Sequence, residues 1–217
     1  MLVWINVDLK KSGKEIRIVL FICTFSQFFN VLEIIMFQLL PLDIKTVFQL
    51  YFLGNLFVCI LIFSYSFSYA TIDIRKILKW FGSGKLLLTI GWIFLILRGR
   101  IPDFISINIA NMIVFSACYY ETLAILSLIK TKPKKAYRLQ LKITIVTMLI
   151  FNIATMLDST INTRVLIASI GLFAIYLQPA ISYIVEKGNN VFRIFYGFCF
   201  VAFEILLLFR IVFNYLN

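Results

Sequence analysis

The sequence contains no histidine among its 217 residues, and only 14% of them are charged. Histidine is the commonest metal ligand and the usual base that activates serine and cysteine nucleophiles. The sequence also lacks a phosphate-binding glycine loop, an HExxH motif and a nucleophile elbow. The aspartates that an intramembrane acid-dyad protease would need fall only at the ends of apolar segments: Asp43, Asp73, Asp103 and Asp158. We therefore predict no catalytic residues, no metal and no cofactor, and expect the protein not to be an enzyme.

Cysteine is scarce as well, and its four positions are far apart. Cys23, Cys59, Cys118 and Cys199 each lie inside an apolar segment, and no pair has metal-ligand spacing. Isolated thiols in such surroundings pack as small apolar groups, so no disulfide framework is predicted. The first apolar run is long and is not followed by a small-x-small cleavage site, which argues against a cleavable signal peptide.

Apolar residues dominate the composition. Hydrophobic residues make up 62% of the chain, and the mean hydropathy is +0.97. A water-soluble domain is close to half apolar and a quarter charged, so this chain has too little polar surface to cover a soluble globule. Segments are apolar throughout and lack the alternation of a membrane barrel strand. The sequence predicts an all-α fold, a polytopic transmembrane helix bundle of about seven spans, with residues 1–217 as a single membrane domain.

A helix needs about 20 mostly apolar residues to cross a bilayer. Seven segments meet this description: 17–40, 46–69, 83–98, 104–129, 141–157, 163–185 and 191–213. The segments 83–98 and 141–157 are short and could extend into their flanking loops. In the segment 17–40, polar residues recur near helical spacing, so it either spans with that stripe toward its neighbours or lies flat at the membrane surface.

Basic residues in the loops indicate the orientation. Sixteen Lys and Arg residues fall on one side of the seven segments, with Lys85 counted in a loop, and four fall on the other. The positive-inside rule then places the N-terminus in the cytoplasm and the C-terminus outside, in a bacterial inner membrane. The net charge of +11 is explained by these loops, so nucleic acid is not an expected partner. The basic loop 130–142 fits anionic lipid or, equally, a protein partner.

Ionisable residues within the predicted spans are candidate functional groups, because charges are costly in hydrocarbon. Four qualify: Glu33, Glu121, Glu204 and Arg210. Glu121 and Glu204 are either part of a proton- or ligand-responsive site, or protonated carboxyls hydrogen-bonded to a neighbouring helix. The sequence pairs neither acid with a second catalytic group.

The loop from Leu97 to Asp103 is the most distinctive stretch. Gly99 permits a tight turn, and Pro102 suits the first turn of a following helix. Arg98 and Arg100 could bind an external anion or anchor the turn to lipid headgroups. Asn108 and Asn111 are three residues apart, on one helix face, and suit interhelical hydrogen bonds.

Two further features concern helix packing. Pro179 lies deep in the sixth segment, where it frees a carbonyl that packing or water must satisfy and acts either as a hinge or as a static kink. Single glycines within spans indicate close approach of neighbouring helices: Gly54, Gly91, Gly171 and Gly197.

From Leu42 onward, about four-fifths of the chain resembles the N-terminal membrane region of bacterial GGDEF-type diguanylate cyclases. The matching residues are Leu42-Asp43, Gly54-Asn55, Gly91-Trp92, Leu97-Arg98-Gly99, Ile101-Pro102-Asp103-Phe104, Ser106-Ile107, Ala110-Asn111, Arg164-Val165-Leu166 and Phe209-Arg210. The resemblance implies a bundle that receives a signal and passes it to a cytoplasmic cyclase. This chain differs in having an additional segment before Leu42 and in ending after Arg210 without a further span or a GGDEF motif, so no cyclase activity is expected.

Three functions remain open. The first is a non-catalytic membrane sensory module that works in the lipid bilayer with an unknown small ligand and a signalling protein partner. Its candidate ligand-binding residues are Arg98, Arg100, Asn108, Asn111, Glu121 and Glu204. The second is a small membrane transporter or transporter subunit that uses Glu121, Glu204 and the break at Pro179, although the sequence shows no internal repeat. The third is a structural or assembly subunit.

Overall fold

The computed structural model describes residues 44–68, 72–128, 134–157 and 160–185, together with positions 201 and 205. These ranges form α2 (Ile44–Ser68), α3 (Ile72–Ile96), a π-helical turn η1 (Phe104–Ile109), α4 (Ala110–Leu128), α5 (Lys134–Leu157) and α6 (Ile161–Val185). Five of the described segments are long and apolar enough to cross a membrane: Gln49–Phe67, Ile74–Ile96, Phe104–Leu128, Lys135–Leu157 and Asn162–Ser182. The helical membrane character predicted from the sequence is confirmed for this part of the chain.

Two predicted spans begin earlier than expected. The segment predicted at 83–98 belongs to a helix that starts at Ile72, and the segment predicted at 141–157 belongs to one that starts at Lys134. The first turns of α3 contain three basic residues, Arg75, Lys76 and Lys79. A helix tolerates them there because long basic side chains can extend their charges to the membrane surface. The predicted segments 17–40 and 191–213 lie outside the described residues.

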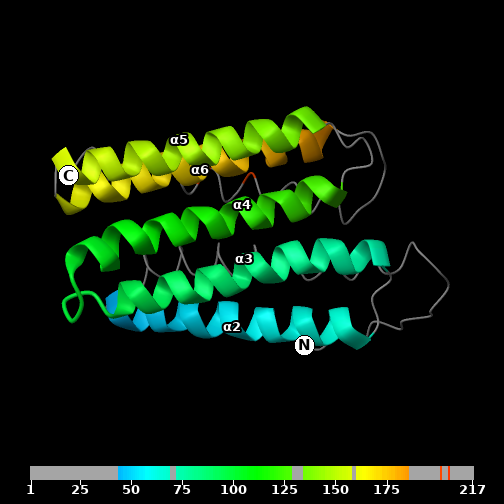
Figure 1. Cartoon of the computed structure of the whole chain (residues 1–217), viewed down its shortest axis with the longest axis horizontal. Helices are drawn as coiled ribbons and strands as arrows, with labels where there is room; N and C mark the ends of the chain where they lie inside the picture. The colour runs from blue at the N-terminus through cyan, green and yellow to red at the C-terminus, as the bar shows by residue number, and fades with distance from the viewer. Residues whose placement is uncertain are drawn as a thin grey trace.

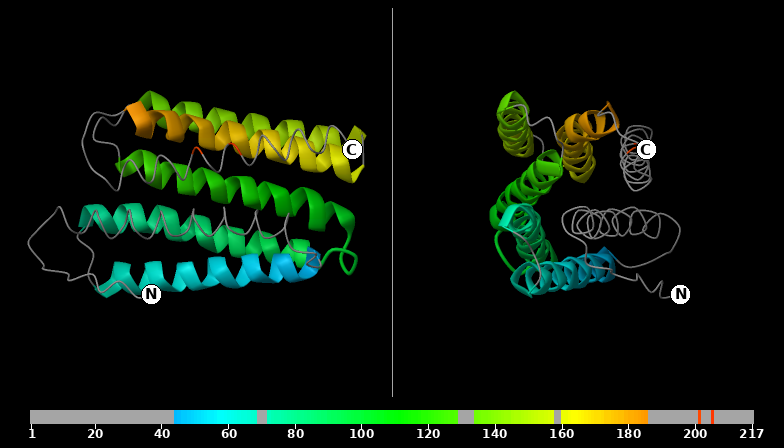
Figure 2. Two further views of the ribbon diagram at one scale, coloured as in Figure 1. Left: turned by 180° about the vertical axis from the view of Figure 1, so that it is seen from behind. Right: turned by 90° about the vertical axis from the view of Figure 1, so that its right-hand side faces the viewer.

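Helix α4 forms the middle of the described bundle. Consecutive helices run antiparallel, with α2 and α3 on one flank of α4 and α5 and α6 on the other (Figure 1). The views from behind and along the helices give the same arrangement (Figure 2). Among the described helices, α4 contacts α3, α5 and α6, whereas α2 contacts only α3. The two flanks are therefore joined through α4.

The turn between α3 and α4 has the predicted form. Gly99 has a φ of +84°, a left-handed conformation that glycine adopts without strain. The Arg100 amide donates to the Leu97 carbonyl at 2.9 Å, which closes the turn. Pro102 lies two residues before η1, and its carbonyl accepts hydrogen bonds from the amides of Ile105 and Ser106 at 2.9 and 3.1 Å.

Glycines bring helices into close contact. A Cβ atom on Gly91 would lie 2.9 Å from the Cγ2 atom of Val114, and one on Gly84 would lie 3.0 Å from the Ala117 carbonyl oxygen. Gly84 and Gly91 are seven residues apart and so face the same side of α3, toward α4. On the other flank, a Cβ atom on Gly171 would meet Thr147 of α5. The prediction that single glycines mark close helix approach is confirmed at Gly91 and Gly171.

Candidate functional site

The centre of the bundle contains an ion pair between α3 and α4. The Nζ atom of Lys85 lies 2.7 Å from the Oε1 atom of Glu121, and both side chains are 0% exposed. The Lys85 ammonium is not aligned with the Glu121 oxygen as a hydrogen-bond donor would be. The short distance between their opposite charges nevertheless makes the contact an ion pair. Lys85 also lies 5.4 Å from the centre of the Phe81 ring, one turn earlier on α3. A charge at this depth is costly unless a partner compensates it, and each member of the pair compensates the other.

The second oxygen of the same carboxylate is bonded from the opposite flank. The Tyr176 hydroxyl of α6 donates to the Oε2 atom of Glu121 at 2.8 Å. Tyr176 is buried, and so is Cys118, which lies one turn before Glu121 on α4. We call Lys85, Glu121 and Tyr176 the central triad. Through it, one carboxylate on α4 holds both α3 and α6.

Local packing explains why the triad forms here. A Cβ atom on Gly84 would lie 2.8 Å from the Cγ atom of Glu121, so the absence of a side chain at this position makes room for the glutamate. Trp80 of α3 stacks on Tyr120, the residue before Glu121 on α4, with ring centroids 5.5 Å apart. Small residues at the α3–α4 contact thus allow two charged side chains to meet in an apolar interior.

Sequence reasoning found only one member of the triad. Glu121 is a predicted site residue, whereas its partners Lys85 and Tyr176 were not predicted. Lys85 was counted as a cytoplasmic loop residue, whereas it lies in the middle of α3, more than three turns from the start of that helix. Removing it lowers the count of basic residues on that side from sixteen to fifteen, which leaves the predicted orientation unchanged. The predicted segment 83–98 already contains Lys85, so its own bounds place this residue inside a span rather than in a loop.

The other predicted site residues lie away from the triad. Asn108 donates from its amide to Asn152 at 3.0 Å and to Thr155 at 2.8 Å, both on α5, so the predicted interhelical bonding holds for this residue. Asn111 instead donates to the Ile107 carbonyl of its own helix at 2.7 Å. Because Glu121 follows Asn108 by thirteen residues, about 20 Å separate the two along the helix. The structure does not bring them together.

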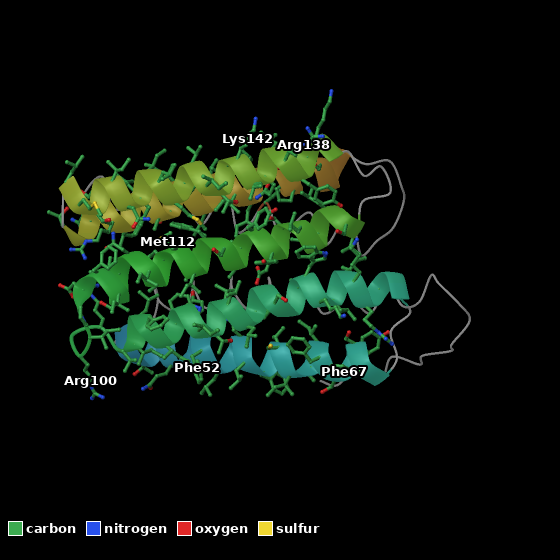
Figure 3. The ribbon with its side chains drawn as sticks, in the orientation of Figure 1. Phe52, Phe67, Arg100, Met112, Arg138 and Lys142 are labelled. Carbon is green, nitrogen blue, oxygen red and sulfur yellow. The ribbon has the colours of Figure 1, made fainter. Side chains whose placement is uncertain are left out.

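Arg98 and Arg100 are exposed in the turn after α3. Arg100 points away from the bundle (Figure 3). Neither arginine makes an ion pair with another residue of the described ranges. Glu204, the remaining predicted site residue, lies outside the described residues.

The break at Pro179 is satisfied by a side chain from α5. Proline has no amide hydrogen, so the Ile175 carbonyl, four residues earlier, loses its helical donor. The Gln140 amide, which is fully buried on α5, donates to this carbonyl at 2.8 Å. The predicted need to satisfy a freed carbonyl is confirmed, and the partner is a neighbouring helix. The freed carbonyl belongs to the residue next to Tyr176, so the break adjoins the triad.

This arrangement gives a testable expectation for Gln140. Gln140→Leu should lower the free energy of unfolding by about 1–3 kcal/mol, because a buried carbonyl loses the Gln140 amide as a donor. In a Pro179→Ala background the restored amide can bond to Ile175, so the same substitution should cost much less. Unfolding in mixed micelles, followed by circular dichroism, measures both effects. Equal costs in the two backgrounds would refute the assigned pairing.

Within the described ranges, no group of three or more His, Cys, Asp or Glu side chains is placed to hold a metal ion. The fold and the site together define a helical membrane bundle with a charged centre. No protein-family model, curated protein or solved structure matches the chain.

Proposed function

We propose that the protein is a non-catalytic sensory module of the bacterial cytoplasmic membrane, with about seven spans, a cytoplasmic N-terminus and an external C-terminus. The orientation is supported by the distribution of charge along the described bundle. Seven Lys and Arg residues stand at the end where α3 and α5 begin, and four stand at the opposite end. An excess of basic residues favours the cytoplasmic side.

The observation that carries the proposal is the shared carboxylate of Glu121. Its two oxygens are held by Lys85 from one flank of α4 and by Tyr176 from the other. A displacement of either flank relative to α4 must lengthen one of these two contacts. Packed helices shift between discrete arrangements rather than deform continuously. The triad is thus suited to be the element whose two states a signal would populate differently.

The route of the signal follows from the same helices. Arg98 and Arg100 are exposed and directly follow α3, the helix that contributes Lys85. In our proposal a small external anion binds at this turn, and the resulting shift of α3 changes the Lys85–Glu121 contact. A separate signalling protein would read out the new helix packing.

Labelling of Cys118 tests whether the triad opens as a unit. Cys118 is 3% exposed and is kept as the only cysteine by replacing the others with alanine. Tyr176→Phe removes one hydrogen bond to a carboxylate, worth about 1.5–3 kcal/mol, and should speed maleimide labelling of Cys118 by about 10- to 100-fold in native membranes. Tyr119→Phe is the matched control, because it removes a hydroxyl from α4, the helix of Cys118, without touching the triad.

The measure that separates a switch from a static contact is global unfolding. Local opening has a smaller free energy than unfolding of the whole bundle. If the triad is a switch, Cys118 must be labelled faster than global unfolding would allow. The rate of labelling must also depend little on the concentration of added sodium dodecyl sulfate. The proposal fails when Cys118 reacts only at the rate of global unfolding, in the wild type and in Tyr176→Phe alike.

A second candidate function is a small transporter or a subunit of one. The observation in its favour is the position of the triad beside the Pro179 break, because interrupted helices next to charged groups form substrate sites in transporters. Reconstituted proteoliposomes under a pH gradient distinguish the two functions. A proton flux that Glu121→Gln abolishes would support transport. Proteoliposomes that show no proton flux under the same gradient would support the sensory module.

A further inference from the structure

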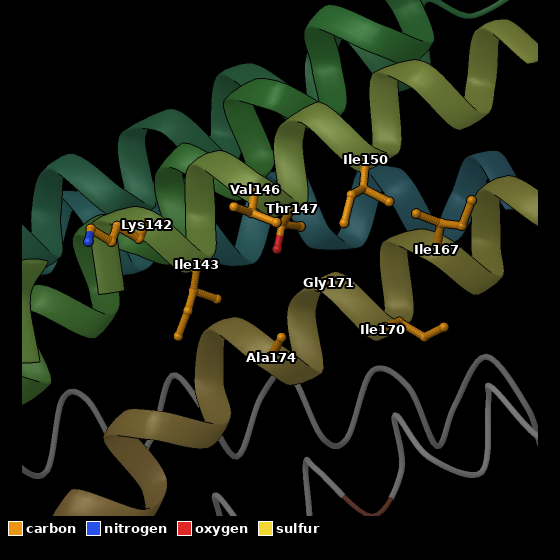
Figure 4. A pocket seen from close by; sticks show the side chains of 9 residues that line it. All are labelled: Lys142, Ile143, Val146, Thr147, Ile150, Ile167, Ile170, Gly171 and Ala174. Carbon is orange, nitrogen blue, oxygen red and sulfur yellow. The ribbon is translucent and has the colours of Figure 1, made fainter. Parts of the chain in front are cut away.

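An apolar groove runs along the outside of the contact between α5 and α6. It has a volume of about 380 Å³, within the range of small-ligand pockets. Isoleucine, valine and small residues line it: Ile143, Val146, Ile150, Ile167, Ile170, Gly171 and Ala174, with Thr147 and Lys142 as the polar side chains. Figure 4 shows these residues along the two facing helices, with Lys142 at one end of the groove.

The charged end of the groove is the end where α5 begins. Arg138 and Lys142 are one turn apart on α5, both are exposed, and both point away from the bundle (Figure 3). Val146 and Ile150 continue the same row at intervals of four residues. From Lys142 to Ile150 the row is about 12 Å long, at 1.5 Å per residue. The surface is therefore cationic at one end and apolar along the rest.

We propose that this groove binds an anionic phospholipid, with one acyl chain between α5 and α6 and the headgroup phosphate on Lys142 and Arg138. The charge pattern matches that of the lipid, and the apolar row of about 12 Å gives an acyl chain a surface to lie along. Ala174 has a small side chain, which leaves room on the α6 side of the groove for a chain to enter. This inference concerns the outer surface of α5 and α6 and is independent of the triad.

The test uses the full-length protein in mixed micelles. The probe is phosphatidylglycerol, compared with phosphatidylcholine of the same acyl chains and with inorganic phosphate. Affinity is measured from the thermal shift and from lipid retained in native mass spectrometry. Phosphatidylglycerol should bind the wild type more tightly than phosphatidylcholine, and phosphate alone should not replace it. Lys142→Gln should weaken phosphatidylglycerol about fivefold, the loss expected for one cation at an anionic membrane surface.

Matched variants separate the groove from its surroundings. Ala174→Phe fills the groove and should reduce lipid retention at least as much as Lys142→Gln. Leu149→Phe, on an exposed part of α5 outside the lining, and Lys79→Gln, on α3 at the same end of the bundle, should leave it unchanged. Equal binding of the two lipids, or an affinity unaffected by Lys142→Gln, would overturn the proposal. The proposal would also be overturned if the protein is a dimer and Ala174→Phe dissociates it without reducing lipid retention. The groove would then be an interface between two copies of the chain.

Discussion

Glu121→Gln and Lys85→Met are each expected to lower the free energy of unfolding by about 3–5 kcal/mol, because each leaves its partner buried without compensation. Both side chains are completely buried, so solvent does not reduce this cost. The double variant Lys85→Met/Glu121→Gln removes both charges and keeps an acceptor for the Tyr176 hydroxyl. It should recover most of the stability, because a buried ion pair replaced by neutral groups costs little. Equilibrium unfolding in mixed micelles gives the coupling free energy.

The control for this cycle is Lys79→Met, which removes an exposed lysine from α3 and should change stability very little. Additive effects of the two triad substitutions would show that Lys85 and Glu121 do not interact in the membrane. That outcome would contradict the ion pair at the centre of the bundle.

Gly84→Ala is expected to separate α3 from α4 at the triad. The new Cβ atom would lie 2.8 Å from the Glu121 Cγ atom and 3.0 Å from the Ala117 carbonyl oxygen. The carbonyl belongs to the backbone of α4 and cannot move aside, so we expect a loss of about 1–3 kcal/mol from overpacking. Because Trp80 stacks on Tyr120 beside this contact, its fluorescence should change as well.

Gly82→Ala provides the comparison for this substitution. The Cβ atom there would meet side-chain atoms of Ile62 and Phe63 at 3.2 and 3.4 Å, and these can adjust. Its effect on stability should be smaller, and the fluorescence of Trp80 should report less change. Equal effects of the two substitutions would mean that close contact with the α4 backbone does not decide the packing of α3.

The helical membrane class could be predicted from the sequence because a lipid solvent requires long apolar segments. These are visible in composition and segment length and need no knowledge of tertiary contacts. Helix starts were less accurate at α3 and α5, where basic residues in the first turns resemble loop residues. The same ambiguity hid Lys85, whose charge was read as a topology signal. Pairing of Lys85 with Glu121 and Tyr176 depends on how α3 and α6 rotate against α4, and a single sequence carries no direct record of that rotation.

Local chemistry was easier to predict than partners. The turn at Gly99 follows from backbone sterics at one residue, and the freed carbonyl at Pro179 follows from the missing amide hydrogen. The donor that satisfies this carbonyl, Gln140, could not be named, because it comes from another helix. Asn108 and Asn111 illustrate the same limit: their spacing suggested one shared role, whereas only Asn108 reaches a neighbouring helix.

Accessibility of single cysteines in living cells tests the membrane-embedded bundle most directly. In a background without the native cysteines, Arg100→Cys and Lys135→Cys place thiols at opposite ends of α4. A membrane-impermeant maleimide should label position 100 in intact cells and position 135 only after the membrane is permeabilised. Labelling of both positions from the same side, or recovery of the protein in the soluble fraction, would contradict the account.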